Sequence, residues 1–223
     1  ILPKQLDEEV AYYVQGRDNA VYFTPEGLTF ALTGGENLTS HSSSDPSQAL
    51  PYNKGRQRRE EGEPKSRMRR WIVKLDFVGA NRDVRPIGQE QSDTKVSYFK
   101  GTPDQWRTSV PAYYRVLYRD LWPGIDLVFY GTINQLKYEF IVHPAANPRR
   151  IRLTYRGTET VTLNNTGQLE VTTPLGGFTD DVPLAYQEID GQRVLVGVAY
   201  DMESSTRGAP SPTSSFKFAF QVG

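Results

Sequence analysis

The sequence predicts an all-β protein, an antiparallel β-sandwich with a long flexible loop at about residues 33–69. In at least six segments apolar and polar residues alternate with a period of two, which is typical of strands with one buried and one wet face. Turn residues are frequent, with 19 Gly and 15 Pro among 223 residues, and Tyr (13) outnumbers Phe (10). Many short strands joined by turns favour packed antiparallel sheets.

The first predicted strands flank a turn. Residues 20–24 and 28–32 lie on either side of Pro25-Glu26-Gly27, a Pro-x-Gly turn that predicts a β-hairpin. The later strands are predicted from the alternation itself, at 71–77, 114–118, 136–142, 151–155, 194–200 and 216–220. Their apolar faces should form the core, and the positions we expect to be buried include Phe77, Tyr138, Phe140, Leu153 and Phe218.

Residues 33–69 differ in composition from the rest of the chain. They are rich in Ser, Pro and charged residues and have almost no apolar periodicity, so burial would not offset the entropy of ordering them. The second half is basic, which suggests a polyanion-binding arm, but Glu60, Glu61 and Glu63 interrupt the positive charge. A solvated loop of mixed charge is the simpler interpretation.

A weak internal repeat suggests a division of the chain. Residues 74–79 and 152–157 share the order basic, Leu, polar, aromatic, any residue, Gly. We therefore predict two tandem sandwich units, residues 1–140 with the flexible loop and residues 141–223. A single domain over residues 1–223 is the alternative, because β-rich strands can resemble one another by chance.

Composition excludes several classes of function. Lys plus Arg (26) equals Asp plus Glu (26), so no bulk field attracts nucleic acid or anionic lipid. The absence of Cys excludes disulfides, thiolate metal sites and a Cys nucleophile. No apolar run reaches the roughly 18 residues of a membrane span. No cofactor is expected.

The residues that could support catalysis are few. Of the two histidines, His41 lies in the Ser-rich loop and His143 ends a predicted strand before a proline, so neither is evidently oriented by a third group. Asp126 and Glu139 could form the carboxylate pair of a glycosidase, but turn capping and cross-strand pairing explain both. We predict no catalytic residues and a non-enzymatic protein.

A calcium site is left open by the sequence. Asp180, Asp181 and Asp190 lie near predicted turns, and carboxylate oxygens are the ligands that hard cations prefer. The spacing of a calcium-binding loop is absent, and Asp residues in turns commonly bond their own backbone.

Four aromatic residues near turns are the candidate ligand-binding residues. They are Trp106, Trp122, Tyr113 and Tyr130. Aromatic rings beside turns can stack on sugar rings, which would suit a polysaccharide ligand. They can equally close the ends of a sandwich, with the polar atom of each ring bonded to the protein.

The middle of the chain resembles a known family. The pattern is roughly NYF-x-G, W-x-T-x-VP, Y-x-x-(L/I)-YPGIDLV-Y-YG and LKYEF-x-V-x-PGA-x-P, and residues 97–101, 106–111, 116–131 and 136–142 resemble it. It is similar to the uncharacterised β-rich N-terminal domain of bacterial secreted and surface proteins with SBBP (seven-bladed β-propeller) repeats. The resemblance extends over most of the chain, although residues 144–148 replace the usual Gly-containing turn.

The resemblance implies an extracellular or cell-surface location in bacteria and a structural or adhesive role. It assigns no catalytic residues. We expect neighbouring β modules or like subunits to pair through an edge strand, with residues 194–202 and 215–222 as the candidate edges. The alternatives are a carbohydrate-binding module, a hydrolase, and a subunit of a self-assembling extracellular filament.

Overall fold

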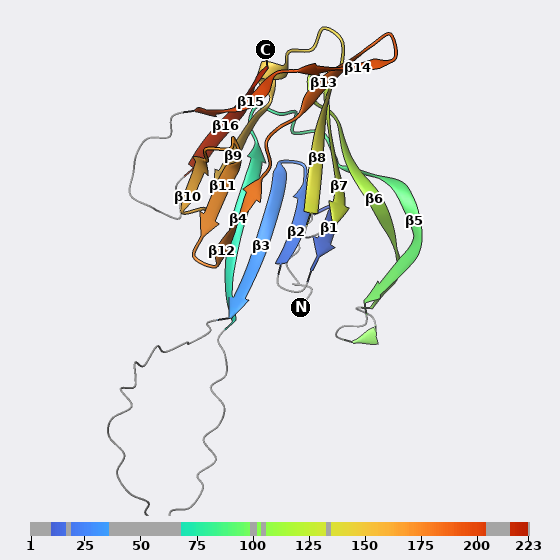
Figure 1. Ribbon diagram of the computed structural model, residues 1–223. Helices are drawn as coiled ribbons and strands as arrows, with labels where there is room; N and C mark the ends of the chain where they lie inside the picture. The colour runs from blue at the N-terminus through green and yellow to red at the C-terminus, as the bar shows by residue number, and fades with distance from the viewer. Residues whose placement is uncertain are drawn as a thin grey trace, which may run out of the picture.

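The computed structural model describes residues 10–16, 19–35, 68–98, 102–103, 106–132, 135–203 and 215–222. Over these residues the protein is all-β and antiparallel, which confirms the predicted fold class, and it contains several sheets (Figure 1). Strands occupy both ends of the predicted 33–69 loop, since one runs to Gly35 and the next begins at Met68. The prediction for residues 36–67 falls outside the described residues.

The largest sheet has seven strands and draws on distant parts of the chain. Its order is β1 (Tyr12–Gln15), β2 (Asn19–Thr24), β3 (Gly27–Gly35), β4 (Met68–Phe77), β9 (Arg152–Arg156), β16 (Ser215–Val222) and β15 (Val198–Glu203). The predicted hairpin at Pro25-Glu26-Gly27 joins β2 to β3. Gly27 has φ +154°, and a Cβ there would meet the Leu75 carbonyl oxygen at 2.0 Å, so only glycine fits.

Three smaller sheets complete the fold. The four-stranded sheet contains β5 (Ile87–Tyr98), β6 (Arg107–Trp122), β7 (Ile125–Thr132) and β8 (Gln135–Val142) in that order. The three-stranded sheet contains β10 (Thr160–Leu163), β11 (Leu169–Thr173) and β12 (Gly176–Asp180). The β13–β14 hairpin, Ala185–Ile189 and Gln192–Val196, stands as a sheet of its own, and a 3₁₀ turn, η2, covers Pro148–Arg150.

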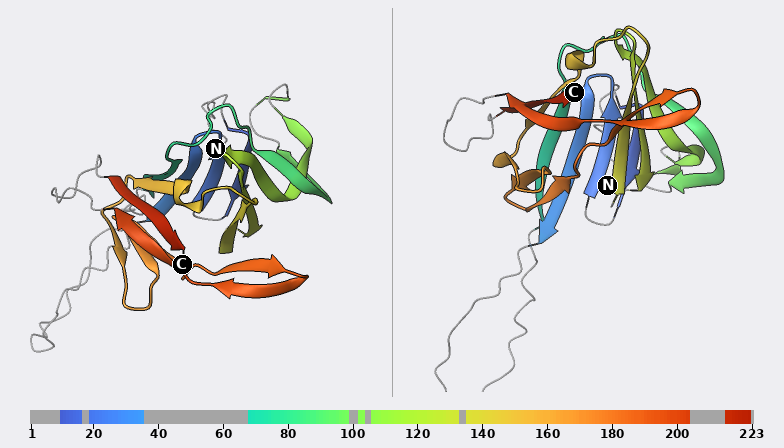
Figure 2. Two further views of the ribbon diagram at one scale, coloured as in Figure 1. Left: turned by 90° about the horizontal axis from the view of Figure 1, so that it is seen from above. Right: turned by 45° about the horizontal axis from the view of Figure 1, so that its top comes forward.

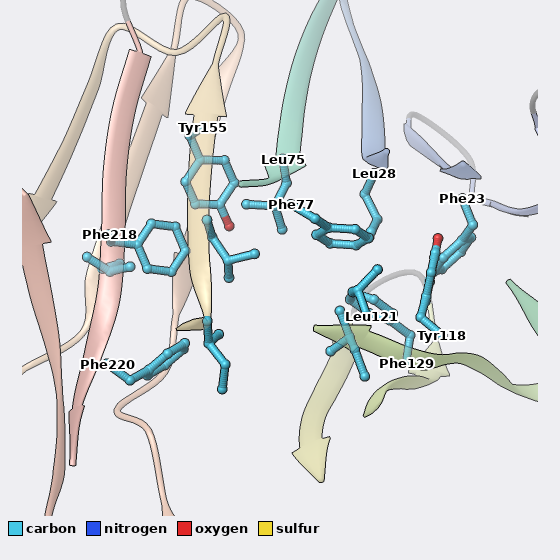
Figure 3. Close-up of a cluster of buried hydrophobic side chains, with 14 of the residues drawn as sticks. Phe23, Leu28, Leu75, Phe77, Tyr118, Leu121, Phe129, Tyr155, Phe218 and Phe220 are labelled. Carbon is cyan, nitrogen blue, oxygen red and sulfur yellow. The ribbon is translucent and has the colours of Figure 1, made fainter. Parts of the chain in front are cut away.

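The core lies between the seven-stranded sheet and the two sheets that cover it (Figure 3). Aromatic pairs join the layers, with Phe23 against Phe129 at 5.5 Å and Phe140 against Phe220 at 5.5 Å between ring centroids. Phe178 of β12 packs on Tyr155 at 5.8 Å, on the same face of the seven-stranded sheet. The dense aromatic packing explains how a chain without Cys holds both covering sheets against the large one.

Most of the predicted core positions are buried. Phe77, Leu153 and Phe218 are 7%, 2% and 0% exposed, which confirms the faces assigned to their strands. Tyr138 and Phe140 are half-buried and pack against the core cluster. Their strand, β8, is the last strand of the four-stranded sheet, so one side of it has no hydrogen-bonded neighbour among the described residues.

Two expectations about the C-terminal strands need correction. Segment 215–222 is not an edge, because β16 lies between β9 and β15. Segment 194–202 is not one strand, because Gly197 separates β14, which pairs with β13, from β15, which pairs with β16. The two edge strands of the large sheet are β1 and β15. The alternation of apolar residues does not show at which residue a segment changes from one partner strand to another.

The seven-stranded sheet also bears on domain organisation. It hydrogen-bonds β4 to β9, so strands from both sides of residue 140 share one sheet. If residues 1–140 and 141–223 are two units, they are therefore joined through this sheet. The division itself stays a prediction.

Candidate functional site

Trp122, one of the four predicted ligand-binding residues, lies in the core. It ends β6, is 1% exposed, and packs edge-on against Phe77 with 6.0 Å between centroids. Its indole N–H donates to the carbonyl oxygen of Val78 at 3.0 Å. The ring has no exposed face for a sugar.

Tyr113 joins the two main sheets. Its ring packs edge-on against Tyr12 of β1, with 5.7 Å between centroids. It also lies over Gly88, where an added Cβ would stand 2.6 Å from the ring, and the Gly88 N–H donates to the Tyr12 hydroxyl at 2.7 Å. These contacts fix β1 against β5 and β6, so the position of Tyr113 is explained by packing.

Tyr130 lies in a charged group on the four-stranded sheet. Its hydroxyl donates to Glu139 Oε1 at 2.7 Å, and the guanidinium carbon of Arg115 lies 5.5 Å from its ring centroid. Arg115 Nε also pairs with Glu90 Oε1 at 3.0 Å. The Glu139 hydrogen bond raises the pKa of Tyr130, and the charge of Tyr186 on the β13–β14 hairpin contributes in the same direction.

Trp106 precedes β6 and is 43% exposed, whereas Tyr113 and Tyr130 are half-buried and Trp122 is buried. Its backbone N–H donates to the Pro103 carbonyl oxygen at 3.2 Å. The structure therefore does not gather the four aromatic residues into one site. Trp122 is inside the core, whereas Tyr130 belongs to a polar surface group.

Asp126 and His143 support the turn between β6 and β7. Asp126 Oδ1 accepts the backbone N–H of Asp120 at 2.6 Å, and its Oδ2 lies 3.1 Å from His143 Nε2. Asp120 has φ +49° and in turn accepts the Gly124 N–H at 2.6 Å. Among the described residues, no hydrogen bond joins His143 to a hydroxyl. The pair thus anchors a strained turn, and Glu139 is bound separately to Tyr130.

A buried polar cluster, which the sequence analysis missed, links three sheets. Tyr138 of β8 donates to Asp180 Oδ2 of β12 at 2.7 Å, and its hydroxyl lies 3.4 Å from that of Tyr200 on β15. Tyr200 donates to the carbonyl oxygen of Asp181 at 2.8 Å. Burial raises the pKa of the Asp180 carboxyl and, more strongly, that of the Tyr138 hydroxyl. Asp180, one of the three aspartates considered above as calcium ligands, thus accepts the hydrogen bond from Tyr138.

A pocket of about 320 Å³ lies beside the end of β4. Its charged lining residues include Glu26, Asp76, Arg82 and Arg156. Arg156 donates to both carboxylate oxygens of Asp76, at 2.7 Å from Nη2. Asp76 and Arg156 are therefore bonded to each other in the wall of this pocket. Within the described part of the chain no group of three or more acidic or His side chains could hold a metal ion.

Exposed apolar side chains concentrate on the β13–β14 hairpin and the segment leading into it. Among the described residues fourteen large hydrophobic side chains are exposed, and six of them lie within residues 182–195. They are Val182, Leu184, Tyr186, Ile189, Val194 and Leu195, with Leu184 76% and Leu195 73% exposed. Figure 2 shows the hairpin, in orange, extending beyond the other sheets.

Both faces of this hairpin are apolar in part. Tyr186 lies opposite Leu195 on one face, where the guanidinium of Arg193 stands 4.4 Å from the Tyr186 ring centroid. Val194 lies on the other face, opposite Gln187, and is 46% exposed. A two-stranded hairpin is only marginally stable by itself in water. Because these apolar side chains are exposed, burial within this chain adds little to the stability of the hairpin. One sequence signal was present, because Val194, Leu195 and Val196 are three successive apolar residues that break the alternation of a half-buried strand.

The outer half of β5 and β6 also extends from the body, but its edges are protected (Figure 1). Lys95 pairs with Pro111, and the register shifts between Gln91 and Lys95 and again between Val96 and Tyr98. Lysine, proline and bulges are the features that keep edge strands from pairing with other chains. β14 has no Pro and no Lys, and it pairs with β13 without a shift.

These features define an all-β, multi-sheet protein with one projecting apolar hairpin. Residues 3–222 match the family described as Domain of unknown function (DUF7948), and the chain belongs to that family. Comparison with curated proteins and with solved structures finds no match. None of the described segments is a helix that could span a membrane.

Proposed function

We propose that this protein is a non-enzymatic structural module that joins other β-structured proteins through the β13–β14 hairpin. The observation that carries the proposal is the exposure of apolar side chains on both faces of a hairpin with unprotected edges. Exposed apolar patches on soluble proteins usually mark interaction sites. An open strand edge binds partners by β-augmentation, in which main-chain hydrogen bonds supply the affinity.

The titratable groups of the fold support a non-enzymatic role. Asp126 and His143 hold a turn, Asp180 joins two sheets through Tyr138, and Glu139 holds Tyr130. Each group has a structural partner, and their arrangement provides no nucleophile next to an oriented base. A broad panel of chromogenic hydrolase substrates should therefore show no turnover above buffer, and turnover that is lost in His143→Ala would overturn this part of the proposal.

The location proposed for the module is the bacterial cell surface or extracellular space. The support is the resemblance of residues 97–142 to domains of secreted proteins with SBBP repeats. In such a setting an adhesive module would hold neighbouring modules or subunits together. Fractionation of a native host, with the chain detected by antibody, would contradict this location if the protein stayed in the cytoplasm.

A carbohydrate-binding module is the second candidate. It is favoured by the open Tyr130 group, in which a fixed aromatic ring lies beside Arg115 and Glu139. Retention of the protein on insoluble polysaccharides would test it. Loss of retention in Tyr130→Ala, with retention kept in Tyr186→Ala, would support a sugar site at Tyr130. No retention of the wild type on any polysaccharide would remove this candidate.

The main proposal is tested with a strand-forming probe. The probe is a soluble peptide of alternating Val and Thr, and the control peptide carries Pro at its centre, which cannot continue a ladder. We expect the amide signals of Arg193 and Leu195 to shift with the first peptide only. If the hairpin amides respond neither to this peptide nor to increasing concentration of the protein itself, the interaction role of the hairpin is wrong.

A further inference from the structure

The turn of the β13–β14 hairpin determines which backbone groups of β14 are unpaired. Asp190 and Gly191 form a two-residue loop with φ +51° and +77°, the pattern of a type I′ turn. The turn hydrogen bond joins its first and fourth residues, Ile189 and Gln192. Because antiparallel pairs alternate between bonded and non-bonded, the N–H and C=O groups of Val194 face β13, and those of Arg193 and Leu195 face outward.

The edge of β14 suits an apolar partner better than the edge of β13. Along β14 the run from Val194 to Val196 places apolar side chains on both faces of the strand. The corresponding stretch of β13 contains Gln187 and Glu188, which a partner strand would have to desolvate. The outward edge of β14 is therefore the favoured contact.

We propose that the partner is a second copy of this chain, bound by antiparallel pairing of β14 with β14 about a two-fold axis at Val194. This rests on the interaction role proposed above. In this register Arg193 lies opposite Leu195 of the second copy, Leu195 lies opposite its Arg193, and the two Val194 residues meet. The outward N–H and C=O groups of Arg193 and Leu195 are then all hydrogen-bonded, because each of these residues lies opposite a residue whose backbone groups also point outward.

Strand length and charge select this register. It pairs all five residues of β14, whereas a shift to the next register of the same parity in either direction pairs only three of them. One of these shifts also places Arg193 directly opposite Arg193 of the second copy, and like charges opposite each other destabilise a strand pair. With Arg193 opposite Leu195, the arginine stem covers an apolar side chain instead, while Arg193 keeps its own-chain partner Glu188, 3.7 Å away.

The pairing converts two marginal hairpins into one four-stranded sheet. One face of that sheet carries Tyr186 and Leu195 from both copies, and the other carries Val194 and Ile189 from both. A two-fold contact of this kind uses the same surface on each copy and closes, so it gives a dimer and not a filament. With only five residues per strand, the buried area falls below the roughly 1,200 Å² of stable complexes, and the dimer should be weak.

The test uses opposite charges at one position. Sedimentation of the wild type should show a concentration-dependent monomer–dimer equilibrium with a dissociation constant of about 10–1000 μM. Leu195→Arg places the new arginine of each copy opposite Arg193 of the other copy. These two contacts between like charges should weaken the dimer by about tenfold or more. Leu195→Glu places Glu opposite Arg193 twice and should tighten it by about threefold or more. Leu184→Arg, at an equally exposed position outside β14, should change little.

The outcomes separate the two proposals. A strict monomer at all concentrations would overturn the second-copy inference, and the interaction role would still stand if the strand peptide shifts the Arg193 and Leu195 amides. Equal weakening by Leu195→Arg and Leu195→Glu would show apolar association without this register and would also overturn the inference. Circular dichroism of each variant confirms that the fold is intact.

Discussion

The carboxyl group of Asp180 should make the stability of the protein depend on pH. Burial raises its pKa above the ordinary 3.8, although the hydrogen bond from Tyr138 acts in the opposite direction. Because the folded state favours the protonated form, the stabilisation from Asp180 is full below pH 3.8 and is lost as the pH rises through the folded pKa. Asp180→Asn still offers an oxygen to Tyr138 but cannot ionise. Its melting temperature should therefore rise relative to wild type between about pH 4 and about pH 7.

The control for this pH effect is Asp190→Asn. Asp190 lies in the exposed turn of the hairpin with φ +51°, a conformation that Asn adopts readily, so this variant makes the same chemical change without disturbing the backbone. If the difference between Asp180→Asn and wild type is constant across this range, or if Asp190→Asn shows the same difference, the Asp180 carboxyl is not the titrating group.

Two phenylalanines of the core allow a matched comparison of burial. Phe218 is 0% exposed, and its ring stacks on Tyr155 at 5.5 Å, so Phe218→Ala should cost about 3–5 kcal/mol of unfolding free energy. Phe140 is half-buried, although it touches Phe220 and Trp122, so Phe140→Ala should cost only about 1–3 kcal/mol. Urea unfolding measures both, and a larger cost at Phe140 than at Phe218 would contradict the burial seen here.

At the scale of elements, the contact between β1 and the β5–β6 ribbon depends on Gly88. A methyl group at this position would collide with the Tyr113 ring, which also packs against Tyr12. Gly88→Ala should therefore destabilise the protein by about 1–3 kcal/mol, as overpacking usually does. Gly197→Ala is the control, because a Cβ there meets nothing within 4 Å, and thermal unfolding of the two variants should differ clearly.

Individual strands were more predictable than their partners. The alternation in 71–77 and 151–155 identified β4 and β9 and their buried faces, because one-sided burial imposes a period of two. The pairing of β4 with β9 was not predictable, because it joins segments about 80 residues apart through tertiary contacts. The same limit explains the error at 215–222, where β16 does have an apolar face but lies inside the sheet, between β9 and β15.

The candidate surface was predictable only in part. Residue type pointed to Trp122 and Tyr130 alike, but only the packed structure separates a core indole from a surface phenol. Residues 194–200 were expected to form one half-buried strand, whereas exposure falls from 46% at Val194 to 6% at Tyr200 along that segment. A sequence pattern can show that a face is apolar, but it does not show whether anything covers it.

At the scale of the whole molecule, the seven-stranded sheet makes the two halves of the chain depend on each other. β4 pairs with β9, and β9 pairs with β16, so the N-terminal strands need partners from beyond residue 140. Leu153, Tyr155 and Phe218 from the second half also fill the core that Phe77 and Leu75 line from the first (Figure 3). Removal of either half would expose this apolar surface to water.

We therefore expect the fragments 1–140 and 141–223 each to lack a cooperative thermal transition, and the full chain to show one. Each fragment would lose both the hydrogen-bonded neighbours of its strands at the β4–β9 junction and the layer that covers its apolar face. Differential scanning calorimetry of the three proteins checks this, and mixing the fragments should restore the transition if the interface is specific. Because two-state unfolding is the behaviour of a single cooperative unit, a cooperative transition in isolated 1–140 would instead support the two-unit division at residue 140.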